Sequence, residues 1–350
     1  MDFGLTEEQV ELAGLTRKIL AGREAPWADL AASGVLAAGL PTSLGGAGLG
    51  LLEQCSVLIE LGRAASDVPY LASIVLGAGA LAAFGTAAQR ERWAGPAGRG
   101  AVVLTAALAE EDGDDPRVPS TRAERADGPW VLTGVKTAVD AAPEADLFLV
   151  PCATPDGVRV FLVAPSDAGV GVEPQRLTDF ASAGRVVLSG VALDDDRVLG
   201  GAEVADWLVA RATVGLCAVQ SGVIERALEL TAEYAKSRVA FGRPIGSFQA
   251  VTQRLADAYV DVEAVRLTLW QAAWLLSSGD CGADVAVAVA KFWAAEAGHR
   301  VAHTAVHVHG GIGVDVTYPV HRYFVAAKQH EFALGGATAQ LRRIGGALAG

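Results

Sequence analysis

The pattern of apolar and polar positions changes twice along the chain. Residues 1–100 have a helical pattern, and Thr6 is a suitable N-cap for the first helix. Short stretches rich in Val, Leu and Thr follow, separated by Gly, Pro and Asp, as is typical of strands. They lie at residues 101–107, 130–139, 146–151, 158–164 and 185–191. Helical spacing then returns, and apolar positions from Val251 to Leu276 recur every three or four residues.

These changes predict an α+β fold with three domains. A helical N-terminal domain is expected at residues 1–100, a middle β-domain at residues 101–198, and a helical bundle at residues 199–350. The middle domain is predicted to be a small antiparallel barrel or sandwich, because no helix-length segment separates its strands. The segment 283–308 is apolar on most sides, as expected for a helix in the middle of a bundle.

Composition narrows the function classes. The net charge of −12 over 350 residues argues against non-specific binding to nucleic acid. A bilayer-spanning helix needs an apolar stretch of about twenty residues, and the sequence contains no uncharged stretch of that length. No membrane contact is therefore expected. The acidic N-terminal stretch lacks the basic region of a secretory signal, and the four cysteines are widely separated. A cytoplasmic protein with reduced thiols is the expectation.

One turn gathers groups that suit a nucleotide. A helix is predicted to run through Phe241, which would place Arg238 and Phe241 on one face, and Gly242 would end it. The next helix is expected to start near Ser247, with Gln249 in its first turn. A guanidinium, an aromatic ring and an amide at one corner could bind a pyrophosphate linked to adenine. Taken singly, Arg238 is more simply interpreted as pairing with a carboxylate, and Phe241 as a core residue.

Several motifs fall in one order along almost the whole chain. They are Leu44–Gly48, Leu132–Lys136, Arg238–Gln249, His309–Gly313 and Tyr318–Arg322. In this order and spacing the chain resembles the acyl-CoA dehydrogenase family. In particular, it is similar to the subunit that lacks a catalytic base in actinobacterial heterotetrameric (α2β2) members. The resemblance implies the family's fold: an N-terminal helical domain, a middle antiparallel β-barrel domain and a C-terminal four-helix bundle.

The resemblance also implies half of a binding site for flavin adenine dinucleotide (FAD). In the family, residues at these positions reach across a subunit interface to the neighbour's FAD. Gly310 and Gly311 would let backbone N–H groups approach the pyrophosphate without a Cβ in the way. Carried over by position, the contacts are Arg238, Phe241, Ile245, Phe248, Gln249, His307, Gly310 and Gly311.

The residues that carry the family's chemistry are missing. Removal of the α-proton of an acyl thioester needs a carboxylate base. Its usual position aligns with Gly336 and the position used by a smaller set of members aligns with Ala212, so neither holds a carboxylate. Glu331, a few residues upstream of Gly336, is the nearest substitute, although a surface or interface carboxylate is the simpler interpretation.

The part of the flavin site expected in the middle domain is altered as well. The family's aromatic residue and hydroxyl residue here become Ala138 and Asp140. Five carboxylates within residues 110–115, together with Asp140, are predicted to repel phosphate-bearing ligands, since like charges about 4 Å apart cost on the order of 4 kcal/mol. The alternative is that residues 110–115 form a solvated acidic loop.

Three histidines step by four residues along one predicted helix. His299, His303 and His307 have the i, i+4 spacing that can bind zinc, but the run lacks the glutamate of an HExxH motif. We therefore expect no metal site, and packing or interface hydrogen bonds for these side chains.

Together these observations predict a subunit of a heteromeric, FAD-dependent acyl-CoA dehydrogenase that is inactive alone. The FAD would be shared at the interface with a partner that carries the catalytic Glu and binds most of the acyl-CoA. Steroid side-chain thioesters are a candidate substrate class. Two alternatives stay open: a homomeric dehydrogenase with Glu331 or Asp140 as an atypical base, and a structural homologue without flavin.

Overall fold

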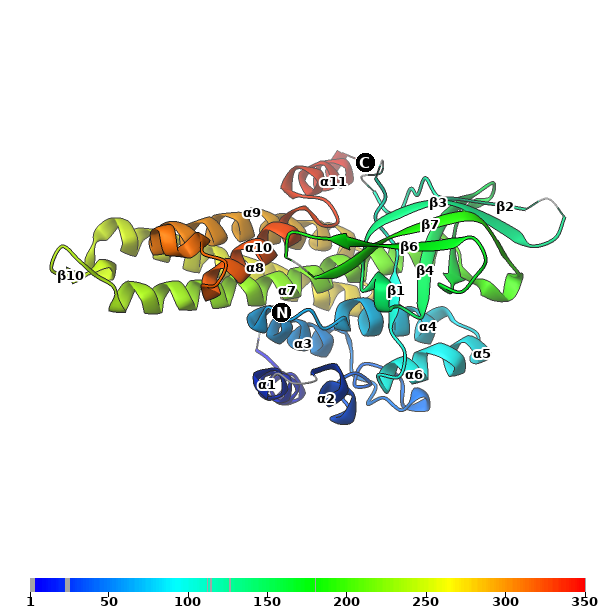
Figure 1. The fold of residues 1–350 in the computed structure, drawn as a ribbon, viewed down its shortest axis with the longest axis horizontal. Coiled ribbons are helices and arrows are strands. Elements are labelled where there is room, and N and C mark those ends of the chain that lie inside the picture. Colours follow the sequence, from blue (N-terminus) through cyan, green and yellow to red (C-terminus); the bar gives the residue numbers. More distant parts are fainter. Residues whose placement is uncertain are drawn as a thin grey trace. The chain divides into compact units, whose positions relative to one another are not determined.

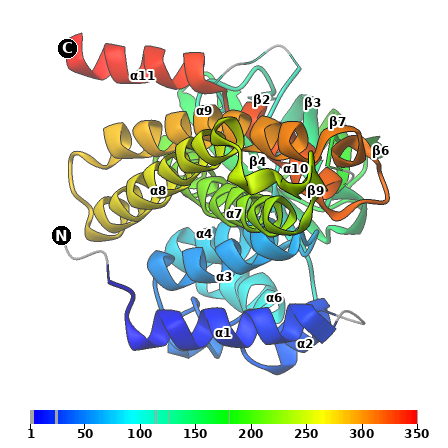
Figure 2. The same cartoon turned by 90° about the vertical axis from the view of Figure 1, so that its left-hand side faces the viewer.

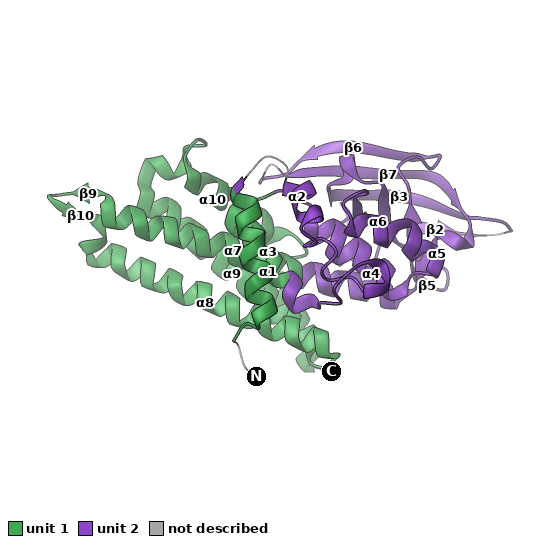
Figure 3. Cartoon of the chain, turned by 90° about the horizontal axis from the view of Figure 1, so that it is seen from below, with its two compact units in different colours: residues 1–21, 55–66, 214–350 green, residues 22–54, 67–213 purple. Residues whose placement is uncertain are grey.

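The computed structural model describes residues 4–22, 26–111, 113, 115–125, 127–179 and 181–349. Contacts divide the chain into two compact units (Figure 3). Unit 1 comprises Met1–Ala21, Cys55–Ser66 and Val214–Gly350, and unit 2 comprises Gly22–Gln54 and Asp67–Thr213. Along the sequence, described helices precede the strands β1–β8 and long helices follow them (Figure 1). This order confirms the predicted fold class, whereas the three domain boundaries stay a prediction.

Unit 1 is mainly helical. Its helices are α1 (Glu7–Gly22), α3 (Leu51–Ala64), α7 (Ala202–Ser237), α8 (Gln249–Ser278), α9 (Ala283–His309), α10 (Pro319–Phe332) and α11 (Ala337–Ala349). Of α3 only the part from Cys55 onward belongs to this unit, and of α7 only the part from Val214 onward. Short elements join them: β9 (Val239–Ala240), β10 (Arg243–Pro244), η6 (Ile245–Ser247) and η7 (Gly310–Val314). The predicted N-cap is confirmed, because the Thr6 hydroxyl oxygen accepts the Gln9 N–H at 3.3 Å.

The helix α9 lies at the centre of this bundle. It packs against α8, α10 and α11, and 14 of its 27 residues are buried, as the sequence predicted. The apolar stripe of α8 is only partly buried. Val262, Val265 and Leu269 are buried, whereas Tyr259 is 61% exposed and no residue before Ala258 is buried. Fully buried residues of the stripe therefore begin only at Val262, which periodicity alone could not show.

Unit 2 contains a second set of helices and one large sheet. The helical segments are α2 (Pro26–Ala32), η1 (Thr42–Leu44), the π-helical η2 (Tyr70–Ala78), α4 (Gly79–Phe84), α5 (Ala87–Gln89), the π-helical η3 (Arg90–Ala94), α6 (Gly95–Gly98), η4 (Ala142–Glu144) and η5 (Asp195–Arg197). The strands are β1 (Leu104–Ala106), β2 (Arg122–Glu124), β3 (Trp130–Asp140), β4 (Leu147–Thr154), β5 (Gly157–Val163), β6 (Val170–Arg176), β7 (Ser182–Leu193) and β8 (Val198–Gly200).

The strand order is β6-β7-β3-β2-β4-β5-β8, with β1 on β4. Most pairs are antiparallel, as predicted, but β4 pairs in parallel with β1 and with β2. The sequence did not predict β2, β6 or β8. β2 has three residues, of which only Ala123 is buried, β6 contains Gly and Pro, and β8 has three residues, so none shows a long apolar alternation.

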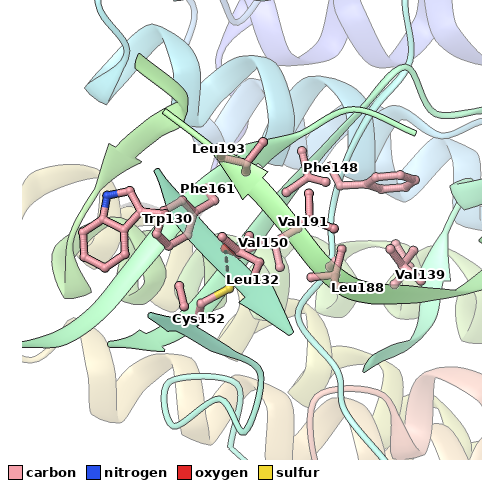
Figure 4. Packing of buried hydrophobic residues seen from close by; sticks show 14 of the residues in the cluster. Trp130, Leu132, Val139, Phe148, Val150, Cys152, Phe161, Leu188, Val191 and Leu193 are labelled. Carbon is pink, nitrogen blue, oxygen red and sulfur yellow. Dashed lines mark hydrogen bonds between the residues drawn. The ribbon is translucent and has the colours of Figure 1, made fainter. Parts of the chain in front are cut away.

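The sheet's core follows from the alternation of side chains along β3 and its neighbours. Trp130 and Leu132 are buried, while Val131 between them is 42% exposed. Phe161 lies edge-on to Trp130, with 5.6 Å between the ring centroids. Figure 4 shows these side chains meeting Phe148, Val150, Cys152 and others from β3, β4, β5 and β7 in one cluster.

The helix α7 is the element, within the described residues, whose length and hydropathy would allow it to cross a bilayer. However, 83% of its most apolar window is buried inside the protein. This burial is what the core helix of a folded domain shows.

Candidate functional site

The turn between α7 and α8 is a hairpin and does not extend α7. That helix ends at Ser237, and Val239–Ala240 pairs with Arg243–Pro244 across a two-residue turn. Phe241 and Gly242 form the turn with positive φ angles of 53° and 79°, which is the geometry of tight hairpins. The prediction that Arg238 and Phe241 share a helical face is therefore wrong, because Gly242 makes a reversal possible directly after Phe241. The ring of Phe241 is 95% exposed, and Arg238 is exposed as well.

The start of α8 differs by two residues from the prediction. Phe248 is its N-cap and Gln249 its first residue, so only the expectation that Gln249 lies in the first turn is confirmed. Ser247 does not cap the helix, since its hydroxyl donates to the Pro244 carbonyl at 2.7 Å. The Phe248 ring lies edge-on to Phe241, and the Arg243 guanidinium lies 4.3 Å from the Phe248 centroid. Sequence reasoning missed Arg243, although a cation two residues after the exposed aromatic was a signal.

The turn at Gly310 and Gly311, which follows α9, lies at the same end of unit 1 as the hairpin. His309 ends α9 and is buried, and its ring stacks on Tyr234 of α7 with 4.3 Å between centroids. Tyr234 in turn accepts the Arg238 N–H at its carbonyl oxygen. Gly310 has φ 67° and ψ −147°, and no atom lies within 4 Å of where a Cβ would be at Gly310 or Gly311.

The predicted flavin contacts thus come together at one end of one unit. His307 is exposed and lines a groove of about 820 Å³ between α8 and α9, and Ile245 is half-buried in the turn before α8. An exposed guanidinium, exposed aromatic surface and open backbone at the glycines fit a ligand that combines phosphates with a planar ring. The donor set of these residues is therefore compatible with the pyrophosphate and adenine of FAD.

The positions expected for the base hold no acid. Ala212 is buried in α7 with 3% exposure, and Gly336 is half-buried in the loop between α10 and α11. The nearest carboxylate in the sequence, Glu331, accepts from Lys328 Nζ at 2.5 Å and lies 3.1 Å from His299 Nδ1. Its charge is balanced within the helical unit by these two partners.

The loop before Gly336 is held by buried polar side chains. Lys291 of α9 is fully buried, and its Nζ donates to the carbonyls of His330 and Glu331 at 3.0 and 3.1 Å. Burial lowers the pKa of Lys291 to about 8. The buried Gln340 donates from Nε2 to Leu334 O and Gly335 O, both at 3.1 Å. The lone Lys291 in an otherwise apolar stretch was the only sequence signal of this arrangement.

The altered flavin positions of the middle domain lie in unit 2. Ala138 has φ 48° at a β-bulge between Lys136 and Val139, and its N–H donates to Gln175 Oε1 at 2.7 Å. Asp140 ends β3 and is exposed. No side chain at position 138 or 140 supplies the aromatic ring or the hydroxyl that the family resemblance implies.

The prediction that residues 110–115 act together as a repulsive acidic run needs correction. Glu110 is paired with the buried Lys136, with 2.7 Å between Oε1 and Nζ, and its side chain is 4% exposed. Burial would raise the pKa of Glu110, but hydrogen bonds from Lys136, Ser120 and Thr121 outweigh this and lower it to about 2. Glu111 pairs with Arg185 at 3.1 Å. Asp112 and Asp114 lie outside the described residues, so at least two of the five charges are already balanced.

The three histidines make contacts of the kind expected for packing. The rings of His299 and His303 lie 4.3 Å apart, and His303 meets Phe324 edge-on. Across the described ranges, no group of three His, Cys, Asp or Glu side chains is arranged to hold a metal ion.

Comparison with known proteins matches almost the whole chain to the domains of one family. The N-terminal, middle and C-terminal domains of acyl-CoA dehydrogenases match residues 7–101, 105–191 and 200–349. "Acyl-CoA dehydrogenase FadE27" from Mycobacterium tuberculosis is 50% identical over 100% of this chain and 99% of its own length.

Two solved structures are also similar to this chain. A chain of the ChsE4-ChsE5 complex from Mycobacterium tuberculosis has a TM-score of 0.95 at 49% identity, covering 100% of this chain and 99% of that chain. A variant of the Tcur3481-Tcur3483 steroid ACAD has a TM-score of 0.93 at 40% identity, covering 98% of both chains. The chain belongs to the acyl-CoA dehydrogenase family.

Proposed function

We propose that this chain is the base-lacking subunit of a heteromeric acyl-CoA dehydrogenase and completes the FAD site of a partner subunit in trans. The observation that carries the proposal is a contrast within the chain. Gly336 and Ala212 provide no carboxylate, while Arg238 and Phe241 are presented to solvent at one end of unit 1. Similarity to chains of the ChsE4-ChsE5 complex and of a two-component steroid ACAD supports the same division of labour.

Each residue has a definite part in holding the cofactor. Arg238 would donate charge-assisted hydrogen bonds to the pyrophosphate, and Gly310 and Gly311 would bring their backbone N–H groups to it. Phe241 and Phe248 would supply flat apolar surface for the adenine, and Gln249 an amide at its edge. Ile245 and His307 would line the same region. When bound, FAD supplies the acceptor for the hydride that leaves the acyl β-carbon.

The partner would supply the rest of the reaction. Its glutamate would remove the α-proton, and it would bind most of the acyl-CoA. An α2β2 assembly would then hold two FAD molecules, and this chain alone would be inactive. The name of one similar complex, a steroid ACAD, favours steroid side-chain thioesters as substrates, and we place the complex in the cytoplasm.

The test is co-expression with the partner subunit, followed by measurement of flavin per chain and dye-linked oxidation of acyl-CoA. Arg238→Ala should weaken FAD binding by about 10- to 100-fold, because a hydrogen bond to a charged group contributes about 1.5–3 kcal/mol. Arg122→Ala, which removes an exposed arginine of β2, is the matched control and should leave FAD binding unchanged.

Other outcomes identify the alternatives. Normal FAD occupancy in Arg238→Ala would exclude donation by this residue. One flavin per chain and turnover by the isolated protein would indicate a homomeric enzyme. Absence of flavin from the assembled complex would indicate a structural homologue.

A further inference from the structure

The hairpin that follows α7 is a small element at the end of unit 1. Its strands β9 and β10 have two residues each, and the Ile245 N–H closes it by donating to Arg238 O at 2.8 Å. The hairpin lies beyond the helices α7 and α8 that it joins (Figure 1 and Figure 2). Isolated two-stranded hairpins are marginally stable at best in water. The side chains at its tip therefore need support from outside the two strands.

Phe241, at the tip of the hairpin, depends most on such support. Its side chain is almost fully exposed, so burial does not fix its orientation. Its φ of 53° lies in a region that non-glycine residues adopt at a cost in energy, and such a conformation persists only where neighbouring groups hold it. The ring lies edge-on to Phe248, with 6.2 Å between the centroids and 88° between the planes. The orientation of Phe241 therefore follows that of Phe248.

Phe248 is itself covered by a cation. The guanidinium carbon of Arg243 lies over the Phe248 ring, 4.3 Å from its centroid. This distance is well within the limit of about 6 Å for attraction between a cation and the face of an aromatic ring. A planar guanidinium also stacks on the ring, which the compact ammonium of a lysine cannot do. Arg243 thus fixes Phe248, and Phe248 fixes Phe241.

No competing interaction holds Arg243 elsewhere. Its side chain is exposed, and among the described residues no carboxylate pairs with its guanidinium. The stack on Phe248 is therefore the contact that this side chain makes within unit 1. Its charge and its flat shape can be tested separately, because a lysine at position 243 keeps the charge and loses the stacking plane.

We propose that Arg243 is a positioning residue for FAD: stacked on Phe248, it holds Phe248 and Phe241 in the orientation that receives the adenine, before the cofactor binds. This inference rests on the proposed function, which gives the two rings to the adenine. It goes further, because it assigns a role to a residue outside the predicted contacts. A surface that is ordered in advance binds more tightly, since less conformational freedom is lost on binding.

The first test reads the rings themselves and needs no cofactor. The full chain is prepared with isotope-labelled phenylalanine, and the ring signals of Phe241 and Phe248 are followed by NMR. Arg243→Lys should shift the signals of both rings, because the stacking plane is lost. Arg92→Lys is the matched control, since the Arg92 guanidinium lies over Trp93 in unit 2 at 5.0 Å from its centroid. This control should shift neither ring.

The second test measures FAD affinity. The complex with the partner subunit is stripped of flavin and titrated with FAD at several salt concentrations, and circular dichroism verifies the fold. Arg243→Lys and Arg243→Ala should each weaken FAD binding about two- to fivefold, the range of an exposed cation–π contact, with the salt dependence of the parent. In a Phe248→Leu background, Arg243→Ala should have no further effect, because the ring that it orders is gone.

Three outcomes would overturn the positioning role. Parent-like affinity in Arg243→Lys, with a loss in Arg243→Ala, would show a charge contact with a phosphate instead. Unchanged ring signals of Phe241 in Arg243→Lys would show that the stack orders nothing. A full effect of Arg243→Ala in the Phe248→Leu background would show that the two residues act independently. Failure of the proposed function is distinguishable, because it appears as unchanged FAD content in Arg238→Ala, whereas the ring signals are read without partner or cofactor.

Discussion

The buried ion pair between Glu110 and Lys136 offers the sharpest test of the energetics in unit 2. Lys136→Met keeps the volume of the side chain but removes its charge. The Glu110 carboxylate would then stay buried, with donors only from Ser120 and Thr121. Removal of one partner of a buried pair costs about 3–5 kcal/mol, so we expect a loss of this size in the free energy of unfolding at pH 7.

The same argument predicts how the free energy of unfolding changes with pH. The pKa of Glu110 in the folded chain is about 2, below its ordinary 4.5, so its contribution to stability is present above pH 4.5 and is lost as pH falls toward about 2. In Lys136→Met the hydrogen bond and the charge of Lys136 are gone, so burial raises the pKa of Glu110 against the remaining donors Ser120 and Thr121 alone, and the pKa is higher than in the parent. The carboxyl then becomes protonated at a higher pH, and the difference from the parent should narrow as pH falls below 7.

Urea unfolding, followed by circular dichroism and by hydrogen exchange of the β3 amides, measures the difference. The double variant Glu110→Gln/Lys136→Met should recover most of the loss, because no unpaired charge is left buried. Arg185→Met, which breaks the exposed pair with Glu111, should change stability little, since solvent screens that pair. A Lys136→Met effect as small as that of Arg185→Met, or one independent of pH, would refute the reasoning.

Two further predictions concern the loop between α10 and α11. Between pH about 8 and 10.5 the unfolded chain binds more protons at Lys291 than the folded chain, so stability should rise with pH there, and urea unfolding of Lys291→Met should lack this rise. Gly336→Glu should fold normally, because the nearest atom to the new Cβ, Glu331 O, is 3.6 Å away. Its melting temperature should match the parent's, and a dye-linked assay of the isolated variant should detect no turnover, because Ala138 and Asp140 are unchanged.

Periodicity predicted the elements whose burial is regular. The strand β3 and the helix α9 were predicted because their side chains alternate between buried and exposed faces, or are buried on most sides. The short strands β2 and β8 were not predicted, because three residues are too few to show a period. The hairpin after α7 was predicted as helix, since the sequence could not decide whether Gly242 ends a helix or reverses the chain.

The candidate site likewise has parts that the sequence could predict and parts that it could not. The proposed flavin contacts around Arg238 and Gly310 lie in contiguous motifs, so a family resemblance was enough to predict them. The buried partners of Glu110 and Lys291 come from positions 26 and about 40 residues away, and only the tertiary fold brings them together. A count of acidic residues therefore exaggerated the charge near Glu110, because the balancing ammonium of Lys136 lies on another strand.

The loop that lacks a base shows why chemistry and conformation can be lost separately. Its backbone is held through carbonyl oxygens: Lys291 binds those of His330 and Glu331, and Gln340 binds those of Leu334 and Gly335. None of these bonds involves a side chain at position 336, so replacing a carboxylate there by glycine removes no support from the loop. Loss of Lys291 would have the opposite effect, because it would leave two buried carbonyls without donors at the end of α10. A subunit could therefore give up proton abstraction while its helical unit, and the presentation of Arg238 at the other turn, stayed intact.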